Sequence, residues 1–140
     1  MAACTFYSSA GEFIKAVEHA GQVLDLYDAE RYGHLADILN HDPKTVALIY
    51  GSWSTWILGY PDRALRLNDE KDAHARQRGH PFELGFALTM GAHQFDHRYD
   101  HEDLRKRAAE VERLGRENSL PVLWAMEAPQ LQGPSIDPGR

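Results

Sequence analysis

The sequence predicts an all-α protein built from antiparallel helix pairs. Three prolines, Pro43, Pro81 and Pro121, lie 38 and 40 residues apart. Each is followed by an apolar stretch that carries aromatic residues, and the first two units then continue into a charged stretch. Self-similarity at such a period is typical of helical repeat arrays. No segment alternates apolar and polar residues between turn signals, as a half-buried strand would.

The length and composition predict one soluble domain, or part of a longer repeat array. The chain has 140 residues, of which 43% are hydrophobic, which is enough for a core. No apolar run approaches the roughly 20 residues of a membrane-spanning helix, and the N-terminus lacks a secretory signal pattern. Cys4 is the single cysteine, so a reducing cytoplasm is expected. The net charge of −6 argues against a nucleic-acid or membrane-surface partner.

The first predicted helix runs from Ser9 to Tyr27. Ser9 followed by Glu12 fits a capping box. Apolar residues then recur at helical spacing: Phe13, Val17, Ala20, Leu24 and Tyr27. A shorter helix is expected over 30–39, so that residues 9–40 form a partial pair. Cys4 is expected in a frayed segment before that pair.

The first full pair is predicted over 43–79. Asp42 suits the N-cap of its first helix, and Pro43 suits the first turn. That helix is apolar nearly all round, so it should be buried. Asp62 is expected to cap the second helix, which ends at Gly79. Five residues of the second helix are expected to face inward: Ala64, Leu65, Leu67, Ala73 and Ala75.

The pattern recurs over 81–119, with a break at 97–100 between the two helices. Leu104, Ala108, Val111 and Gly115 mark the inner stripe of the second helix of this pair. A half pair follows over 121–128. The sequence thus predicts one domain, 1–128, of about six helices. The tail at 129–140 is rich in proline and glycine and is expected to be flexible.

The turn between the helices of the first full pair resembles the tetratricopeptide repeat. The segment reads "LGYPDRAL", and Gly59 precedes Ala64 by five residues, as the turn glycine and small second-helix residue of that motif do. Ser52 supplies the small residue of the first helix. This resemblance implies a right-handed superhelix. The units are longer than the 34 residues of that motif, and the second unit lacks the turn glycine.

Several segments, in order, are similar to the helical repeat region of large bacterial signalling ATPases, which often carry class III cyclase domains. They are "GEFIKAVEHAGQVLDLYD", "NHDPKTVAL", "WILGYPDRAL", "RGHPFELGFAL" and "NSLPVLWA". The resemblance implies a cytoplasmic sensing or scaffolding region whose catalytic domains lie elsewhere. No "GxxxxGK[ST]" phosphate loop is present. We therefore expect a non-catalytic regulatory module that binds a protein or peptide and needs no cofactor.

Four aromatic residues form the candidate binding groove: Tyr50, Trp53, Trp56 and Tyr60. In tetratricopeptide arrays the first helices line a concave groove that holds partner segments. Trp53 and Trp56 lie about 60° apart around a helix, so one can face the groove while the other packs inward. Packing of all four in the core is the alternative structural interpretation. A small-molecule sensor built around the same aromatic residues is an alternative function.

A histidine cluster raises the possibility of a metal site. His93, His97 and His101 are spaced by four, with Asp100 close by. Histidines four apart on one helix can share a metal, and a carboxylate can complete the ligand set. A metal-dependent hydrolase is therefore another alternative. Because the cluster spans the predicted break, polar turn residues explain it equally well.

The repeat array also leads to an expectation about assembly. The partial pair at 9–40 and the half pair at 121–128 would each leave apolar surface that a neighbouring repeat normally covers. We therefore expect a homodimer that packs exposed ends or grooves together.

Overall fold

The computed structural model describes residues 2–34, 38–39, 41–97 and 101–123, without the side chains of 93–97. Within these ranges every regular element is an α-helix, which confirms the all-α part of the predicted fold class. None of the helices in the described part of the chain is both long and apolar enough to cross a membrane.

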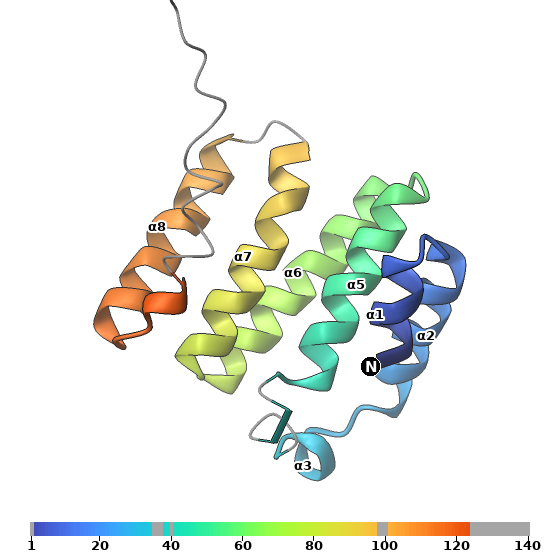
Figure 1. Cartoon of the computed structure of the whole chain (residues 1–140), viewed down its shortest axis with the longest axis horizontal. Coiled ribbons are helices and arrows are strands. Elements are labelled where there is room, and N and C mark those ends of the chain that lie inside the picture. The colour runs from blue at the N-terminus through green and yellow to red at the C-terminus, as the bar shows by residue number, and fades with distance from the viewer. Residues whose placement is uncertain (1, 35–37, 40, 98–100, 124–140) are drawn as a thin grey trace, which may run out of the picture.

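Six helices form three consecutive pairs that stack side by side (Figure 1). The pairs are α1 (Ala2–Ser9) with α2 (Phe13–Leu26), α5 (Pro43–Ile57) with α6 (Pro61–Arg78), and α7 (Pro81–His97) with α8 (His101–Glu117). The first helices contact one another in the order α1, α5, α7. The second helix of one pair packs on the first helix of the next, α2 on α5 and α6 on α7. Helix α5 is therefore central to the stack.

The N-terminal pair differs from its prediction. Residues 2–9 form α1, which ends at Ser9, and Gly11 turns the chain with φ +79°. Ser9 does not cap the next helix: α2 begins after Glu12, whose side chain makes no capping hydrogen bond. Cys4 is fully buried and packs with Ala20 and Ala47, so the expected frayed segment is wrong. Burial raises the pKa of its thiol.

The predicted helix over 30–39 is only partly represented in the described residues. Helix α3 covers Ala29–Tyr32, and the Asp28 carboxylate caps it by accepting hydrogen bonds from the amides of Glu30 and Arg31. Residues 35–37 and 40 lie outside the described ranges.

The boundaries of the central pair follow local chemistry. The Asp42 carboxylate accepts hydrogen bonds from the amides of Lys44 and Thr45, at 2.9 and 3.1 Å, which confirms the predicted N-cap. Gly79, with φ +69°, ends α6 as predicted. The cap expected at Asp62 is wrong, because α6 already begins at Pro61 and Asp62 lies in its first turn.

The buried face of α6 was predicted only in part. Ala64 and Ala75 are fully buried, as expected, but Ala73 is exposed. The other core positions of α6 are polar: Asn68, Lys71 and Asp72.

The third pair matches its prediction more closely. Helix α7 ends at His97 and α8 begins at His101. Ala108, Val111 and Gly115 of the predicted stripe are buried, and Leu114 joins them. Residues 124–128 of the predicted half pair and the tail at 129–140 lie outside the described part of the chain.

Candidate functional site

The four predicted aromatic residues differ in burial: Tyr50, Trp53 and Trp56 are half-buried, and Tyr60 is exposed. Tyr50 is half-buried against the cluster of Cys4 and Ala47, towards the first pair. Its ring meets Trp53 edge to face, with centroids 5.4 Å apart. The indole Nε1 of Trp53 donates a hydrogen bond to the Met90 carbonyl on α7, at 3.1 Å. These two rings are thus engaged in packing between helices, whereas Tyr60 is 61% exposed.

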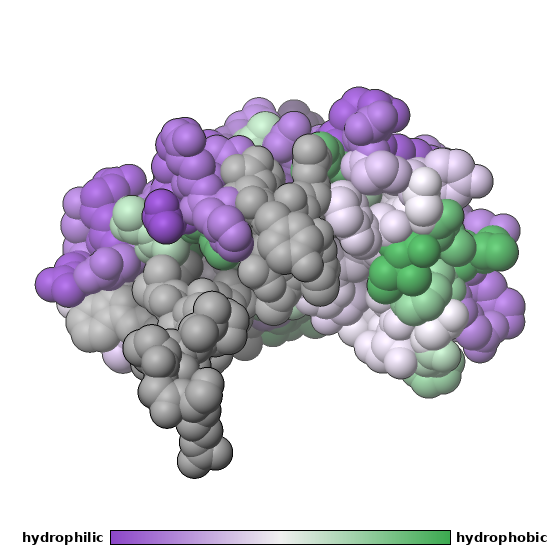
Figure 2. All heavy atoms as spheres, turned by 90° about the horizontal axis from the view of Figure 1, so that it is seen from above, coloured by the Kyte–Doolittle hydropathy of each residue, from purple (hydrophilic) through white to green (hydrophobic). Residues whose placement is uncertain are grey.

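Exposed apolar side chains gather where α1 turns into α2 and α5 turns into α6. Figure 2 shows them on the right of the view. A hydrogen bond between the hydroxyls of Ser54 and Ser8 joins the ends of α5 and α1 there, at 3.2 Å. We call this patch the turn surface, and its large members are Ile14, Ile57, Leu58 and Tyr60. Exposed apolar side chains that gather on one part of a surface are a feature of interaction sites.

The predicted metal site is not assembled on a single helix. His93 and His97 lie on α7, whereas His101 begins α8. The side chains of His93 and His97, and all of Asp100, lie outside the described part. No group of three potential metal ligands occurs among the residues that the structure does describe.

A buried polar cluster, absent from the sequence prediction, joins all three pairs near the start of α5. We call it the junction cluster; its members are Tyr27, Asp42, His74, Arg78 and Glu83. The Asp42 carboxylate is fully buried. It accepts a hydrogen bond from the Tyr27 hydroxyl at 2.7 Å and lies 2.9 Å from His74 Nε2. Tyr27 follows α2 and His74 lies on α6, so this carboxylate holds both to α5.

Arg78 extends the junction cluster to the third pair. Its guanidinium lies 3.3 Å from Asp42 Oδ2 and 3.2 Å from Glu83 Oε2 on α7. It also donates a hydrogen bond to the Gly33 carbonyl, just after α3, at 3.0 Å. Glu83 in turn accepts a hydrogen bond from the Thr45 hydroxyl at 2.7 Å. Two buried carboxylates are therefore bridged by one guanidinium at the meeting point of four helices.

Ionisation within the junction cluster follows from these contacts. Burial alone would raise the pKa of Asp42, but hydrogen bonds from His74, Tyr27 and the Thr45 amide outweigh it and lower that pKa. Burial and the hydrogen bond to Asp42 raise the pKa of Tyr27 to about 12. Asp42 is thus held as a carboxylate and Tyr27 as a neutral phenol.

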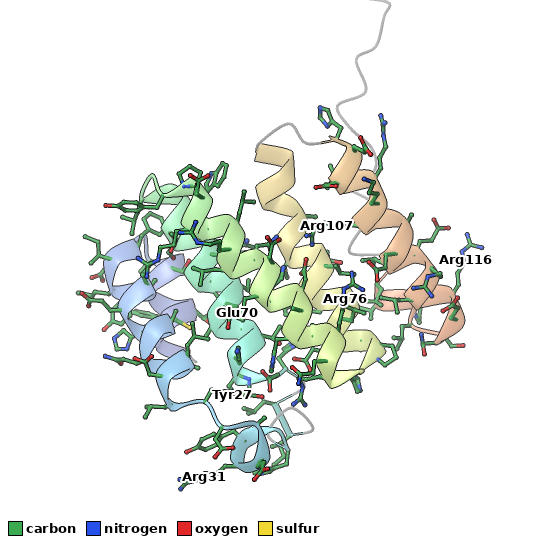
Figure 3. All side chains as sticks on the ribbon, turned by 180° about the vertical axis from the view of Figure 1, so that it is seen from behind. Tyr27, Arg31, Glu70, Arg76, Arg107 and Arg116 are labelled. Atoms are coloured by element: carbon green, nitrogen blue, oxygen red, sulfur yellow. The ribbon has the colours of Figure 1, made fainter. Side chains whose placement is uncertain are left out.

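A second buried polar cluster joins α6 to α8 and packs against α7. We call it the seam cluster; it comprises Asn68, Lys71, Asp72 and Arg107. The Lys71 amine is fully buried and donates to Asn68 Oδ1 at 2.7 Å, and it lies 3.1 Å from Asp72 Oδ1. Arg107 reaches Asp72 from α8 at 2.5 Å. Figure 3 shows Arg107 beside Arg76, which forms a two-pronged ion pair with Glu110 of α8.

The environment of the Lys71 amine is closed on all sides. Burial lowers its pKa to about 8, and the neighbouring Asp72 only partly opposes that effect. Gly91 of α7 lies directly over it: a Cβ at residue 91 would collide with the Lys71 amine and lie 2.5 Å from Asn68 Oδ1. Lys71 therefore lies in the packed contact between α6 and α7.

One sequence signal could have revealed both clusters. Ala64, Asn68, Lys71, Ala75 and Arg78 follow one another at spacings of four, three, four and three, which places them on one face of α6. A search for apolar stripes passes over this face, because its central members are polar. The small Ala64 and Ala75 on the same line mark it as a contact face.

Comparisons of the chain with protein-family models, with curated proteins and with solved structures found no match. The interaction role proposed below is therefore based on the geometry of the described residues.

Proposed function

We propose that the chain is a non-catalytic, tetratricopeptide-like interaction module that binds a protein partner, as part of a bacterial signalling ATPase or cyclase system. The order of helix contacts supports the repeat assignment, because each pair packs on its neighbour as in stacked repeats. The system to which it belongs rests on the sequence resemblance.

The observation that supports the interaction role is the contrast between buried ionisable side chains and exposed apolar side chains. The buried ionisable groups of the junction and seam clusters contact one another across helices and stabilise the stack. The turn surface, by contrast, presents Ile57, Leu58 and Tyr60 to solvent. Exposed tyrosine and aliphatic side chains together favour a protein surface as the ligand.

The alternative function is a small-molecule sensor whose site would be formed by the aromatic residues of the predicted groove. Trp53 gives its indole hydrogen bond to the Met90 carbonyl, and its ring packs against Tyr50. With these two groups used inside the stack, we favour a protein partner at the exposed turn surface over a small molecule between the rings.

Selection from a displayed peptide library tests the proposal. Peptides selected on the wild type should lose at least about tenfold in affinity for Ile57→Ser, as a lost anchor of about 1.4 kcal/mol implies. Ile38→Ser is the matched control, because Ile38 is also an exposed isoleucine, at 71% against 57% for Ile57, and lies outside the turn surface. Peptides that bind wild type and Ile57→Ser equally well would remove the turn surface as the binding site.

A further inference from the structure

Leu123 occupies a notch formed by the third pair. The side chain is fully buried and packs with Leu88 of α7 and with Val111 and Leu114 of α8. Gly85 forms the floor of the notch: a Cβ at that residue would lie 2.5 Å from Leu123 Cδ1 and 2.9 Å from Cδ2. The missing side chain at Gly85 therefore creates the space that Leu123 fills.

The connection that leads to this notch is short and strained. Only Asn118 and Ser119 separate the end of α8 from Leu120. Ser119 has φ +54°, and it is the single non-glycine residue with positive φ in the described part of the chain. A serine in the left-handed region is disfavoured because its Cβ crowds the backbone. The Leu120 amide donates to the Gly115 carbonyl at 2.9 Å, which holds the turn closed.

We propose that residues 120–123 exchange between two copies of this chain, so that Leu123 of each copy fills the Gly85 notch of the other. Short hinges under strain favour such exchange, because opening relieves the strain while the docked contacts are kept. A second copy is the partner whose chemistry fits, since it supplies the same leucine that the notch already holds. The turn surface takes no part, so the exchange is independent of the proposed partner binding.

Sedimentation velocity over a wide range of protein concentration tests the exchange. The fraction of wild-type protein in the dimer should increase as the protein concentration increases. Ser119→Gly relieves the strain of the closed form and should weaken the dimer at least about fivefold. Inserting two glycines after Ser119 lengthens the hinge without touching the notch, and should also shift the equilibrium to monomer.

Two further variants locate the contact. Leu123→Ala should abolish the dimer, whereas Val122→Ala should leave it unchanged, because Val122 lies in the same segment but is 48% exposed. Circular dichroism checks that every variant is folded. A wild type that stays monomeric throughout, or a dimer that neither hinge variant weakens, would overturn the proposal.

Discussion

The Lys71 amine is fully buried between α6 and α7. Its charged form therefore destabilises the folded state, because burial removes the hydration of the charge. Its folded pKa of about 8 lies below the ordinary value of 10.5. Between these values the unfolded chain binds more protons, so the free energy of unfolding rises with pH. The buried Cys4 thiol, whose pKa is raised above its ordinary value of 9.0, opposes this trend from about pH 9 upward, and Tyr27, with its pKa raised to about 12, opposes it from pH 10 upward. The contribution of Lys71 to the free energy of unfolding should rise by about 2 kcal/mol from pH 8 to pH 10.

Urea unfolding at a series of pH values measures this effect. Lys71→Met should remove the rise and should keep the fold, because Asp72 still pairs with Arg107. If the free energy of unfolding of Lys71→Met rose with pH by the same amount, the effect would belong to another group.

Two aspartates of the chain cap helices, yet they should differ strongly in importance. Asp42→Ala removes a cap together with the centre of the junction cluster, and should cost about 3 kcal/mol or more. Asp28→Ala removes only the cap of the exposed four-residue α3, and should cost about 0.5–1 kcal/mol. Chemical denaturation of both variants compares them directly. Equal losses would mean that the junction cluster adds nothing to the cap.

The lowered pKa of Asp42 also predicts that the free energy of unfolding depends on pH in the acid range. Since its folded pKa is lowered, the stabilisation it provides is complete above its ordinary pKa of 3.8 and is lost as pH falls through the folded value. The difference in unfolding free energy between wild type and Asp42→Ala should therefore shrink below about pH 4. Thermal unfolding followed by circular dichroism at pH 3 and pH 7 measures it. A difference that is unchanged at pH 3 would contradict the assigned ionisation.

At the scale of the helical element, the approach of α7 to α6 depends on Gly91. Gly91→Ala would push a methyl group into Lys71 and Asn68, and should destabilise the protein by about 1–3 kcal/mol. Gly21→Ala in α2 is the matched control. No atom lies within 4 Å of a Cβ at residue 21, so the better helix propensity of alanine should stabilise the protein by about 0.5–1 kcal/mol. Opposite signs in denaturant unfolding are the expected result, and two changes of the same sign would contradict it.

Two helix ends of the central pair were predictable because they depend on residues next to one another in the chain, whereas the caps expected at Ser9 and Asp62 were wrong. The two predictable ends are the cap at Asp42 and the stop at Gly79. The short α1 was missed, because its eight residues are mostly small or polar and depend on Cys4 packing against α2 and α5. The polar face of α6 was missed for a related reason. A buried lysine is explained only by Asp72 beside it and by Gly91 opposite, and the latter is twenty residues away in sequence.

For the candidate site, the sequence identified residue types but not their surroundings. Tyr60 is an exposed aromatic residue, whereas Trp53 is hydrogen-bonded to Met90. Both lie in one stretch of similar composition, so only the placement of α7 separates their roles.

At the scale of the whole molecule, the stack is organised around α5. This helix contacts α1, α2, α6 and α7, whereas α3 has four residues, none of them buried. Amide hydrogen exchange should therefore be slowest in α5 and fastest in α3, because opening α5 requires disruption of all its neighbours. Exchange followed by mass spectrometry of peptide fragments gives this order. Protection of α3 equal to that of α5 would contradict it.

The junction cluster has a consequence for synthesis on the ribosome. Asp42 leaves the ribosome well before His74, Arg78 and Glu83, and until then Tyr27 is its one partner from that cluster. The first pair and α5 can associate early, but this carboxylate gains its guanidinium partner only after α6 has emerged. The junction cluster is therefore complete only after the first turn of α7, which carries Glu83, has emerged.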